Sequence, residues 1–406
     1  SRPSRAPACG RAAAPRTANA MNVPLYPQPL GGESRLRDVE LAVGRPQELA
    51  YVGQSVPVSV VLRQRGTVSD RAELVLSGDG KEVARQTAPL AADGVTTTHF
   101  QVTHDKSGLY RYHVSAEPVA GEASSENNAG TFLLRVVEQP IRVLLLEGKP
   151  YWDAKFLTRT LSADPSLELD GVVKLSDSRF VMRRLRLRRP DDAADGARPQ
   201  RTETSEMIDS PEAVLASPAG LSAYQVIVLG RDSEVFLSDE LLARLRTWVS
   251  RDGGSLVCYR GSPVSRVDQE LGRLLPVNWT PSRESRFRMR LTGRGQDLSW
   301  LTPAAVGEED EVLARLPSLA TVAQPEQAKP LAVVLATSQE NDEAPLLTYQ
   351  SYGTGRVVTI EGAGMWRWAF LAPQLQSHDS VYATLWQSLL RWLVSSVGLV
   401  PGQDLA

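Results

Sequence analysis

Apolar and polar residues alternate with a period of two between Asp38 and Glu138, the spacing of a strand with one buried face. The alternating runs are short, and Gly, Asp and Asn residues separate them. Asp79 and Gly80 lie between two such runs, and an Asp-Gly pair in this position is a strong hairpin signal. No helical pattern intervenes. We therefore predict an Ig-like, all-β sandwich of about seven strands over residues 38–138.

The pattern changes after Pro140. Residues 141–148 form a continuous apolar run, as expected of a parallel strand buried on both faces, and helical spacing follows over 151–163. Further strand-like runs lie at 167–176, 224–232 and 255–261. Before the last of these, Ser238 caps a predicted helix with one leucine-rich face. This alternation predicts a doubly wound, flavodoxin-like α/β domain over residues 139–400.

Four segments depart from this alternation. Residues 183–217 are charged and without period, which predicts a solvated, mobile insertion. Residues 286–361 contain four strand-like runs and predict a β-rich extension, and an apolar stripe predicts a final helix over 380–397. Residues 1–37 are rich in Ala, Arg and Pro and predict a disordered tail or linker. The ending GLVPGQDLA reads as a sequence cut mid-protein, so we expect further chain beyond it.

The charge balance argues against two classes of partner. The 406 residues include 45 Lys and Arg against 47 Asp and Glu, a net charge of −2. A nucleic-acid or anionic-membrane binder should carry a basic excess, so we expect neither partner. No apolar run reaches the roughly 18 residues that span a bilayer, so any membrane anchor would lie outside this chain.

Cysteine and histidine usage predicts no metal site and no cofactor. The two cysteines, Cys9 and Cys258, are too few for a metal site built on cysteine pairs. Cys9 falls in the predicted tail, so we expect no disulfide between them. His99, His104 and His113 lie on alternating runs without neighbouring ligand residues, so we interpret them as surface residues.

Polar and aromatic residues gather where the predicted parallel strands end. Ligands of open α/β sheets bind outside the carboxyl ends of the strands. The candidate ligand-binding residues at these ends are Glu147, Lys149, Tyr151, Trp152, Asp153, Arg231, Asp232, Arg260, Glu361, Trp366 and Arg367. Two interpretations stay open: a polar pocket with aromatic walls, or a buried ion-pair network such as Glu147 or Glu361 with Arg260. We expect Trp152 and Phe156 to anchor the first helix onto the sheet.

Two stretches carry resemblances to known families. GEASSENNAGTFLLRVVE resembles the last hairpin of bacterial Ig-like modules, in which a Glu-Asn-Asn turn precedes the final strand. Three stretches resemble a glutamine-amidotransferase-like domain of large, planctomycete-type, membrane-anchored bacterial proteins. These are VLLLEGKPYWDAKFL, YQVIVLGRDSEVFLSDELLARLRTWVSRDGGSLVCYRGSP and YGTGRVVTIEGAGMWRW, the last followed by LWQSLLRWLVSS. The second resemblance covers about residues 141–400.

The amidotransferase resemblance implies machinery that this sequence lacks at the matching positions. Such enzymes place a Cys on the tight turn after a strand, and a His-x-Glu pair supplies the base, because a thiolate nucleophile needs a neighbouring base. Here SLVCYRGS puts Arg260 on that turn, and TIEGAGMWRW contains no His. An alternative catalytic triad in chain order is Cys258, His378 and Asp379.

These observations lead to three functional hypotheses. The first is a non-catalytic amidotransferase-like domain that serves as an interaction or ligand-sensing module of a larger cell-envelope protein. The second is an active amidotransferase or hydrolase that uses Cys258 with His378, or a carboxylate such as Glu147, Asp153 or Glu361. The third is a carbohydrate or cell-wall binding module. We expect a periplasmic or extracytoplasmic location, although a cytoplasmic one stays open, and partners among other envelope proteins or other domains of the parent chain.

Overall fold

A computed structural model describes residues 37–395, except 45–48, 53–54, 67–68, 120, 189–199, 216–217, 298–311, 314 and 341–343. The predicted tail, apart from Arg37, lies outside the described residues. Cys9 and the last eleven residues, 396–406, lie outside them as well. Among the described residues, no helix is both long enough and apolar enough to cross a bilayer.

The N-terminal part is a β-sandwich of two sheets. Its strands are β1 (Asp38–Val43), β2 (Leu49–Tyr51), β3 (Val56–Arg65), β4 (Arg71–Gly78), β5 (Lys81–Pro89), β6 (Val95–Val102), β7 (Gly108–Ala116) and β8 (Ala129–Val137). One sheet has the order β1-β3-β6 and the other β2-β8-β7-β4-β5, and alternate side chains from both enclose one apolar core. Asp79 and Gly80, at φ 48° and 79°, form the expected tight turn between β4 and β5. The prediction of a β-sandwich is confirmed.

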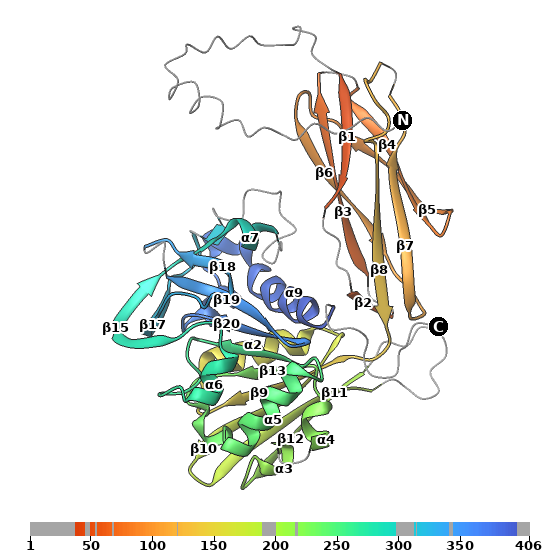
Figure 1. The fold of residues 1–406 in the computed structure, drawn as a ribbon. Helices are drawn as coiled ribbons and strands as arrows, with labels where there is room; N and C mark the ends of the chain where they lie inside the picture. Colours follow the sequence, from red (N-terminus) through yellow and green to blue (C-terminus); the bar gives the residue numbers. More distant parts are fainter. Residues whose placement is uncertain are drawn as a thin grey trace, which may run out of the picture.

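The sandwich contacts the second part of the chain through β2 and β8 (Figure 1). β2 pairs in parallel with β8, and β8 leads within a few residues into the first strand of the second part. Leu49 and Tyr51 on β2 are buried in the core cluster of that second part, beside Ile141. The short strand β2 therefore joins the two parts through shared apolar packing.

A ten-stranded sheet organises the second part. Its strands are β9 (Ile141–Glu147), β10 (Leu167–Ser176), β11 (Arg179–Arg188), β12 (Gln200–Ile208), β13 (Val226–Leu229), β14 (Ser255–Tyr259), β16 (Met289–Leu291), β18 (Val333–Ser338), β19 (Pro345–Tyr352) and β20 (Gly355–Ile360). The order across the sheet is β12-β11-β10-β9-β13-β14-β20-β19-β18-β16. β10, β9, β13, β14 and β20 run parallel to their neighbours among themselves, and the outer strands pair antiparallel. β15 (Trp279–Phe287) and β17 (Leu319–Pro325) form a separate two-stranded sheet.

Helices cover both faces of the central strands. They are α2 (Trp152–Ala163), α3 (Glu212–Leu215), α4 (Pro218–Ser222), η1 (Ser233–Phe236), α5 (Asp239–Ser250), α6 (Gln269–Leu274), α7 (Gly293–Asp297), η2 (Met365–Ala369), η3 (Pro373–His378) and α9 (Val381–Ser395). α2 and α9 share one core cluster with the sheet, and α5 and α6 share the other. The Ser238 hydroxyl accepts a hydrogen bond from the Leu241 amide at 3.3 Å, so the predicted cap of α5 is confirmed.

The predicted flavodoxin-like, doubly wound domain is wrong. Strands make up 47% of the structure and helices 23%, and most neighbouring pairs of the ten-stranded sheet are antiparallel. A flavodoxin-like sheet is mostly parallel, with a helix in each crossover. Here β10, β11 and β12 follow one another as a meander without helices, and β16, β18 and β19 extend the opposite side. The second part is therefore a strand-rich mixed sheet.

The segment 183–217, predicted as a mobile insertion, contains most of β11 and all of β12. β11 pairs with β12 from Phe180 opposite Ile208 to Arg188 opposite Gln200. Arg184 and Glu206 form an ion pair across this hairpin at 2.5 Å. The expectation of an aperiodic segment is therefore wrong for the described part, because charged side chains line both strands of a regular ladder.

Candidate functional site

The candidate residues lie where β9, β13, β14 and β20 end. Parallel neighbours bring their carboxyl ends to one edge of the sheet. Glu147 is the last residue of β9, and Asp232 follows β13 by three residues. Arg260 and Glu361 come directly after β14 and β20. The topology therefore places these four predicted residues along one edge, as the sequence suggested.

Arg260 and Glu147 form a buried ion pair. Their side chains are 1% and 0% exposed, and Arg260 Nη2 donates to Glu147 Oε2. The Tyr259 hydroxyl donates to the other carboxylate oxygen, Oε1. Burial raises the pKa of Glu147 above its usual value, and the charge and hydrogen bond of Arg260 oppose that rise. Of the two open interpretations, the ion-pair network therefore describes Glu147.

Aromatic rings enclose the Arg260 guanidinium. Its central carbon lies 4.1 Å from the ring centroid of Tyr151 and 4.7 Å from that of Tyr259. The Arg260 backbone has φ 68°, in the left-handed region that non-glycine residues rarely adopt. A strained backbone and a clamped side chain together hold the charge at the turn where the resemblance implies a nucleophile.

Gly230 creates the space that the Glu147 carboxylate fills. A Cβ atom at Gly230 would lie 2.2 Å from Glu147 Cδ and Oε2. Gly230 also donates its backbone amide to Leu146 O at 2.8 Å, which fixes the start of the loop after β13. The buried ion pair therefore depends on a missing side chain in the neighbouring strand end.

Lys149, Tyr151 and Asp232 form a second polar group nearer the surface. The Tyr151 hydroxyl donates to Asp232 Oδ2 at 2.5 Å, and Lys149 Nζ lies 3.4 Å from the same oxygen. Partial burial acts to raise the pKa of Asp232, but the bonds from Tyr151 and Lys149 outweigh it and lower the pKa. Burial, followed by the Asp232 contact, raises the pKa of Tyr151 to about 12. Asp232 is therefore ionised at neutral pH and bonds to Tyr151 and Lys149.

Asp153 and Arg367 hold the loop after β20. The Asp153 carboxylate accepts the backbone amides of Gly364 and Trp366, both at 3.1 Å. Arg367 Nε donates to Gly364 O at 3.2 Å, and its Nη2 donates to Ser318 O. Both side chains bond to backbone groups, so their role in this structure is to position η2.

Glu361 is buried, and only one of its two carboxylate oxygens has a hydrogen-bond partner among the described residues. The residue is 0% exposed, and its Oε1 accepts the Trp279 indole N–H at 2.7 Å. No hydrogen-bond partner reaches Oε2 within the described residues. Gly261, at φ 89°, lies so close that an added Cβ would stand 2.7 Å from this oxygen. Burial raises the pKa of Glu361 to about 8, and the Trp279 bond opposes the rise. Glu361 therefore does not pair with Arg260 in the way the sequence allowed.

Trp152, Phe156 and Trp366 form an aromatic surface beside the site. Trp152 is 59% exposed, and the three ring centroids lie 5.6–6.3 Å apart. Lys155 Nζ lies 4.8 Å from the Trp152 ring centroid. The expectation that Trp152 anchors α2 onto the sheet is wrong, because the buried side of the helix carries Ala154, Leu157 and Leu161 instead.

A cleft of about 930 Å³ opens beside Arg260. The loops after β13 and β14 form one side, with α6 next to them. The start of β15, the middle of β17 and Lys329 form the other side. Sequence reasoning found Arg231, Asp232 and Arg260 but missed Trp279 and Lys329. Their signal is weak, since neither follows an apolar strand: Trp279 begins β15, and Lys329 lies beyond β17 and bonds to carbonyls at the end of α6.

The alternative catalytic triad is not assembled. Cys258 is 0% exposed and packs with α5 and α6 in one core cluster, and burial strongly raises the pKa of its thiol. His378 ends η3, directly before α9, whose buried residues belong to the cluster on the opposite face. The sheet therefore separates Cys258 from the segment that carries His378 and Asp379. A buried thiol of this kind is inert as a nucleophile.

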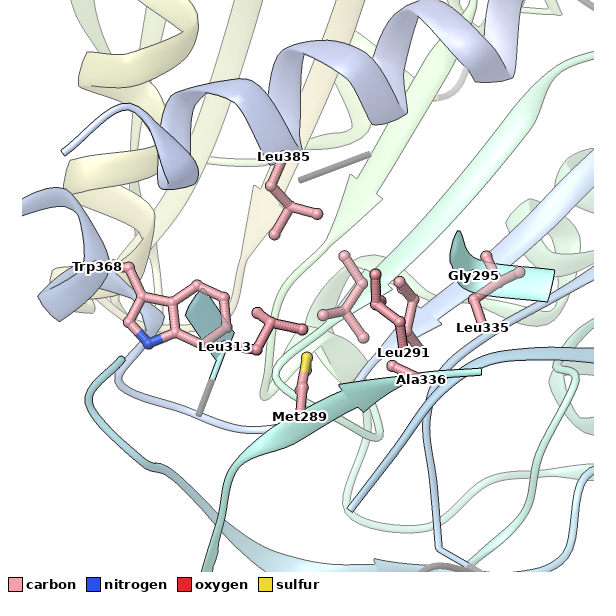
Figure 2. Close-up of a pocket in the computed structure, with 10 residues that line it drawn as sticks. Met289, Leu291, Gly295, Leu313, Leu335, Ala336, Trp368 and Leu385 are labelled. Atoms are coloured by element: carbon pink, nitrogen blue, oxygen red, sulfur yellow. The ribbon is translucent and has the colours of Figure 1, made fainter. Parts of the chain in front are cut away.

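A second cavity is apolar and small. It has a volume of about 10 Å³ and is lined by side chains such as Met289, Leu313 and Trp368, with Leu385 of α9 above them (Figure 2). This space holds about one water molecule, and its walls offer no polar partner to keep one. The cavity is a packing gap between α9 and the antiparallel strands. Within the described ranges, His, Cys, Asp and Glu side chains do not gather in a group of three suited to a metal ion.

Comparison with known proteins shows no family. No family model and no curated protein matches the chain. A CARDB domain of the PF1109 protein from Pyrococcus furiosus, solved with di-metal ions, is 18% identical over 27% of this chain and 100% of that domain, with a TM-score of 0.25. A β-glucosidase from Listeria innocua, solved with glucose, is 20% identical over 28% of this chain and 18% of its own, with a TM-score of 0.20. The chain thus spans less than a fifth of that enzyme, and likenesses this weak carry no functional argument.

Proposed function

We propose that the second part of the chain is a non-catalytic, glutamine-amidotransferase-like binding module. In this proposal it serves as an interaction or ligand-sensing domain of a larger, extracytoplasmic cell-envelope protein. Its partners are other envelope proteins or other domains of the parent chain. The observation that carries the proposal is the buried Arg260–Glu147 pair at the turn after β14.

The chemistry of this pair argues against acyl transfer at the turn. A nucleophile must be able to lose a proton, and a guanidinium stays protonated throughout the physiological range. A general base must reach a substrate, yet Arg260 and Tyr259 occupy both oxygens of Glu147. Cys258, the nearest thiol in sequence, points into the core on the α5 side. The groups at this turn are therefore suited to fixing the loop after β14 and keeping the Arg260 charge in place.

The cleft beside Arg260 supports a binding role. Its volume of about 930 Å³ is of the size that small-molecule sites commonly have. Backbone and side-chain bonds fix its loops: Ser233 N donates to Pro263 O at 2.9 Å, and Asp268 caps α6 at Leu271 N at 2.7 Å. A pre-formed cleft loses little conformational entropy when a ligand binds.

Measurement of ammonia release from glutamine tests the non-catalytic claim. We expect the full chain to release no ammonia above buffer, and Cys258→Ala to behave identically. Glu147→Gln and Glu361→Gln extend the assay to the two buried carboxyls. Ammonia release by the wild-type chain that any one of these substitutions abolishes would overturn the proposal.

A carbohydrate-binding role is a second candidate, and the aromatic surface favours it. Trp152 is 59% exposed beside Trp366 and Phe156, and large exposed aromatic rings mark binding surfaces more often than chance. Affinity electrophoresis in gels that contain soluble glucans or peptidoglycan fragments would test it. Retardation of the wild type that Trp152→Ala removes would support this candidate, and equal mobility in every gel would rule it out for those glycans.

A further inference from the structure

The cleft beside Arg260 carries an excess of positive charge. Five cationic side chains line it, namely Arg231, Arg260, Arg266, Arg273 and Lys329. Three carboxylates line it as well, namely Asp232, Asp268 and Glu326. This balance differs from that of the whole chain, in which acidic residues slightly outnumber basic ones. A concave surface of one sign concentrates ligands of the opposite sign.

Three of the five cations already have partners. Arg260 pairs with Glu147, and Arg273 Nη1 donates to Glu270 Oε1 at 2.8 Å. Lys329 Nζ donates to two carbonyls at the end of α6, with a distance of 2.7 Å to Leu275 O. These contacts hold the cleft walls together, so the three groups contribute charge but have few donors to spare.

Arg231 and Arg266 have no such partners. Among the described residues, no carboxylate forms an ion pair with either guanidinium, and no acceptor hydrogen-bonds to either one. Arg231 is half-buried on the loop after β13, and Arg266 is exposed on the loop after β14. Ser233 N bonds to Pro263 O at 2.9 Å, and the Ser265 amide bonds to the Glu234 carboxylate, so the two loops are tied to each other. Two guanidinium groups without an ion-pair partner among the described residues therefore lie on two loops that are tied to each other.

The carboxylates of the cleft bond to other groups than these two arginines. Asp232 is taken by Tyr151 and Lys149, and Asp268 caps α6. Glu326 is exposed on the opposite side of the cleft. Glu361 bonds to the Trp279 indole; burial raises its pKa, and the charge of Arg231, which forms no ion pair with it, opposes the rise. The Arg231 and Arg266 guanidinium groups are therefore left without an ion-pair partner among the described residues.

One buried donor of Arg260 is also unsatisfied. Arg260 is 3% exposed and lines the cleft, and its Nε has no hydrogen-bond partner within the described residues. Buried donors in folded proteins normally have an acceptor. The unpaired donors of Arg231 and Arg266 suit one class of ligand, which presents several negatively charged oxygens.

We propose that this cleft binds a small oxyanion, a carboxylate- or phosphate-bearing molecule, through Arg231 and Arg266. Guanidinium groups suit such ligands because their donors match the paired oxygens of carboxylate and phosphate. The proposal rests on the proposed binding function and names the class of ligand for that function.

Titration calorimetry on the full chain tests this assignment, with citrate and inorganic phosphate as probes and glucose as the neutral control. We expect one or both anions to bind with an affinity that falls as NaCl is raised. Arg231→Gln should weaken binding by about tenfold or more, since it removes a charged donor. The matched control Arg63→Gln removes a charge from the sandwich surface and should leave the affinity unchanged.

The outcomes separate the oxyanion assignment from the proposed function. Binding of citrate alone assigns a carboxylate ligand, and binding of phosphate alone assigns a phosphoryl ligand. Absence of heat with both anions up to about 10 mM, or equal affinity in Arg231→Gln and wild type, overturns the oxyanion site. Neither result bears on ammonia release from glutamine, which tests the non-catalytic claim separately. Thermal unfolding without ligand should be the same for both variants, which shows that a lost affinity is not a lost fold.

Discussion

Arg260 and Glu147 are joined by an ion pair that is closed to solvent, although they lie 113 positions apart in the chain. Glu147 ends β9, and Arg260 follows β14, which lies two places from β9 in the sheet. The pair spans Leu229 and Gly230 at the end of the strand between them. The pair therefore links the carboxyl ends of three neighbouring strands, at the edge of the sheet where the candidate site lies.

Removal of one partner of this pair should be strongly destabilising. Arg260→Met leaves an uncompensated buried carboxylate, and we expect a loss of about 3–5 kcal/mol in the free energy of unfolding. The double variant Arg260→Met/Glu147→Leu should recover most of that loss, because no charge remains buried. Urea unfolding followed by circular dichroism measures both. As a control, Arg63→Met breaks an exposed pair with Glu40 and should cost less than about 1 kcal/mol. A mild effect of Arg260→Met would show that the pair is solvated.

Gly230→Ala should disturb the same pair through sterics alone. The added Cβ would lie 2.2 Å from the Glu147 carboxylate, so Glu147 or the loop must move. We expect a destabilisation of about 1–3 kcal/mol, typical of overpacking. Gly171→Ala is the matched control within the sheet, since a Cβ there meets nothing within 4 Å. Equal stability of the two variants in the same urea titration would contradict the described contact.

Glu361 should make the protein less stable as the pH rises. Burial raises its pKa from 4.5 to about 8, so the folded state holds a proton that the unfolded state releases. Its contribution is therefore fully present below pH 4.5 and is lost as the pH rises toward about 8. Glu361→Gln cannot titrate and should flatten this decline. Unfolding free energies at pH 5 to 8 compare it with Glu126→Gln, an exposed control. A Glu361→Gln profile parallel to that of the wild type would contradict an elevated pKa.

Trp366 fluorescence should report the clamp made by Asp153. Asp153→Ala removes the acceptor of the Gly364 and Trp366 amides and should loosen η2, at a cost of about 1–3 kcal/mol. Asp153→Asn keeps one acceptor oxygen and should have a smaller effect. Acrylamide quenching of tryptophan emission should be weakest in the wild type, stronger in Asp153→Asn and strongest in Asp153→Ala. Identical quenching in all three would place the restraint on η2 elsewhere.

Periodicity predicted the elements whose apolar residues face a core. The run at 141–147 became β9, and the helix after Ser238 became α5, because both bury several large apolar side chains. It failed for β11 and β12, whose described outer positions carry charged residues. Backbone pairing and ion pairs such as Arg184–Glu206 hold these two strands together, and neither kind of contact produces a periodic apolar pattern in the sequence. The flavodoxin-like prediction also failed on the other side of the sheet, because the runs over 286–361 predicted strands but could not show that β16, β18 and β19 join the same sheet antiparallel.

The site was predictable only in part. Residues directly after apolar strands, such as Glu147 and Arg260, were found because parallel strands share a carboxyl edge. Whether they pair with each other depends on the order of strands across the sheet, which one sequence does not specify. Trp279 and Lys329 were missed because neither directly follows an apolar strand that ends at this edge of the sheet. The prediction for Trp152 was wrong because helical spacing alone does not show that the first residue of α2 is exposed.

The central claim is that the turn after β14 holds no working nucleophile, and intact-mass spectrometry with a glutamine-like haloketone tests it most directly. Such a reagent alkylates an activated thiolate that binds it, and a buried thiol with a raised pKa should not react. We predict that peptide mapping finds Cys258 unmodified in the native protein and modified only after unfolding in urea. Rapid modification of Cys258 in the native protein, prevented by excess glutamine, would contradict the account.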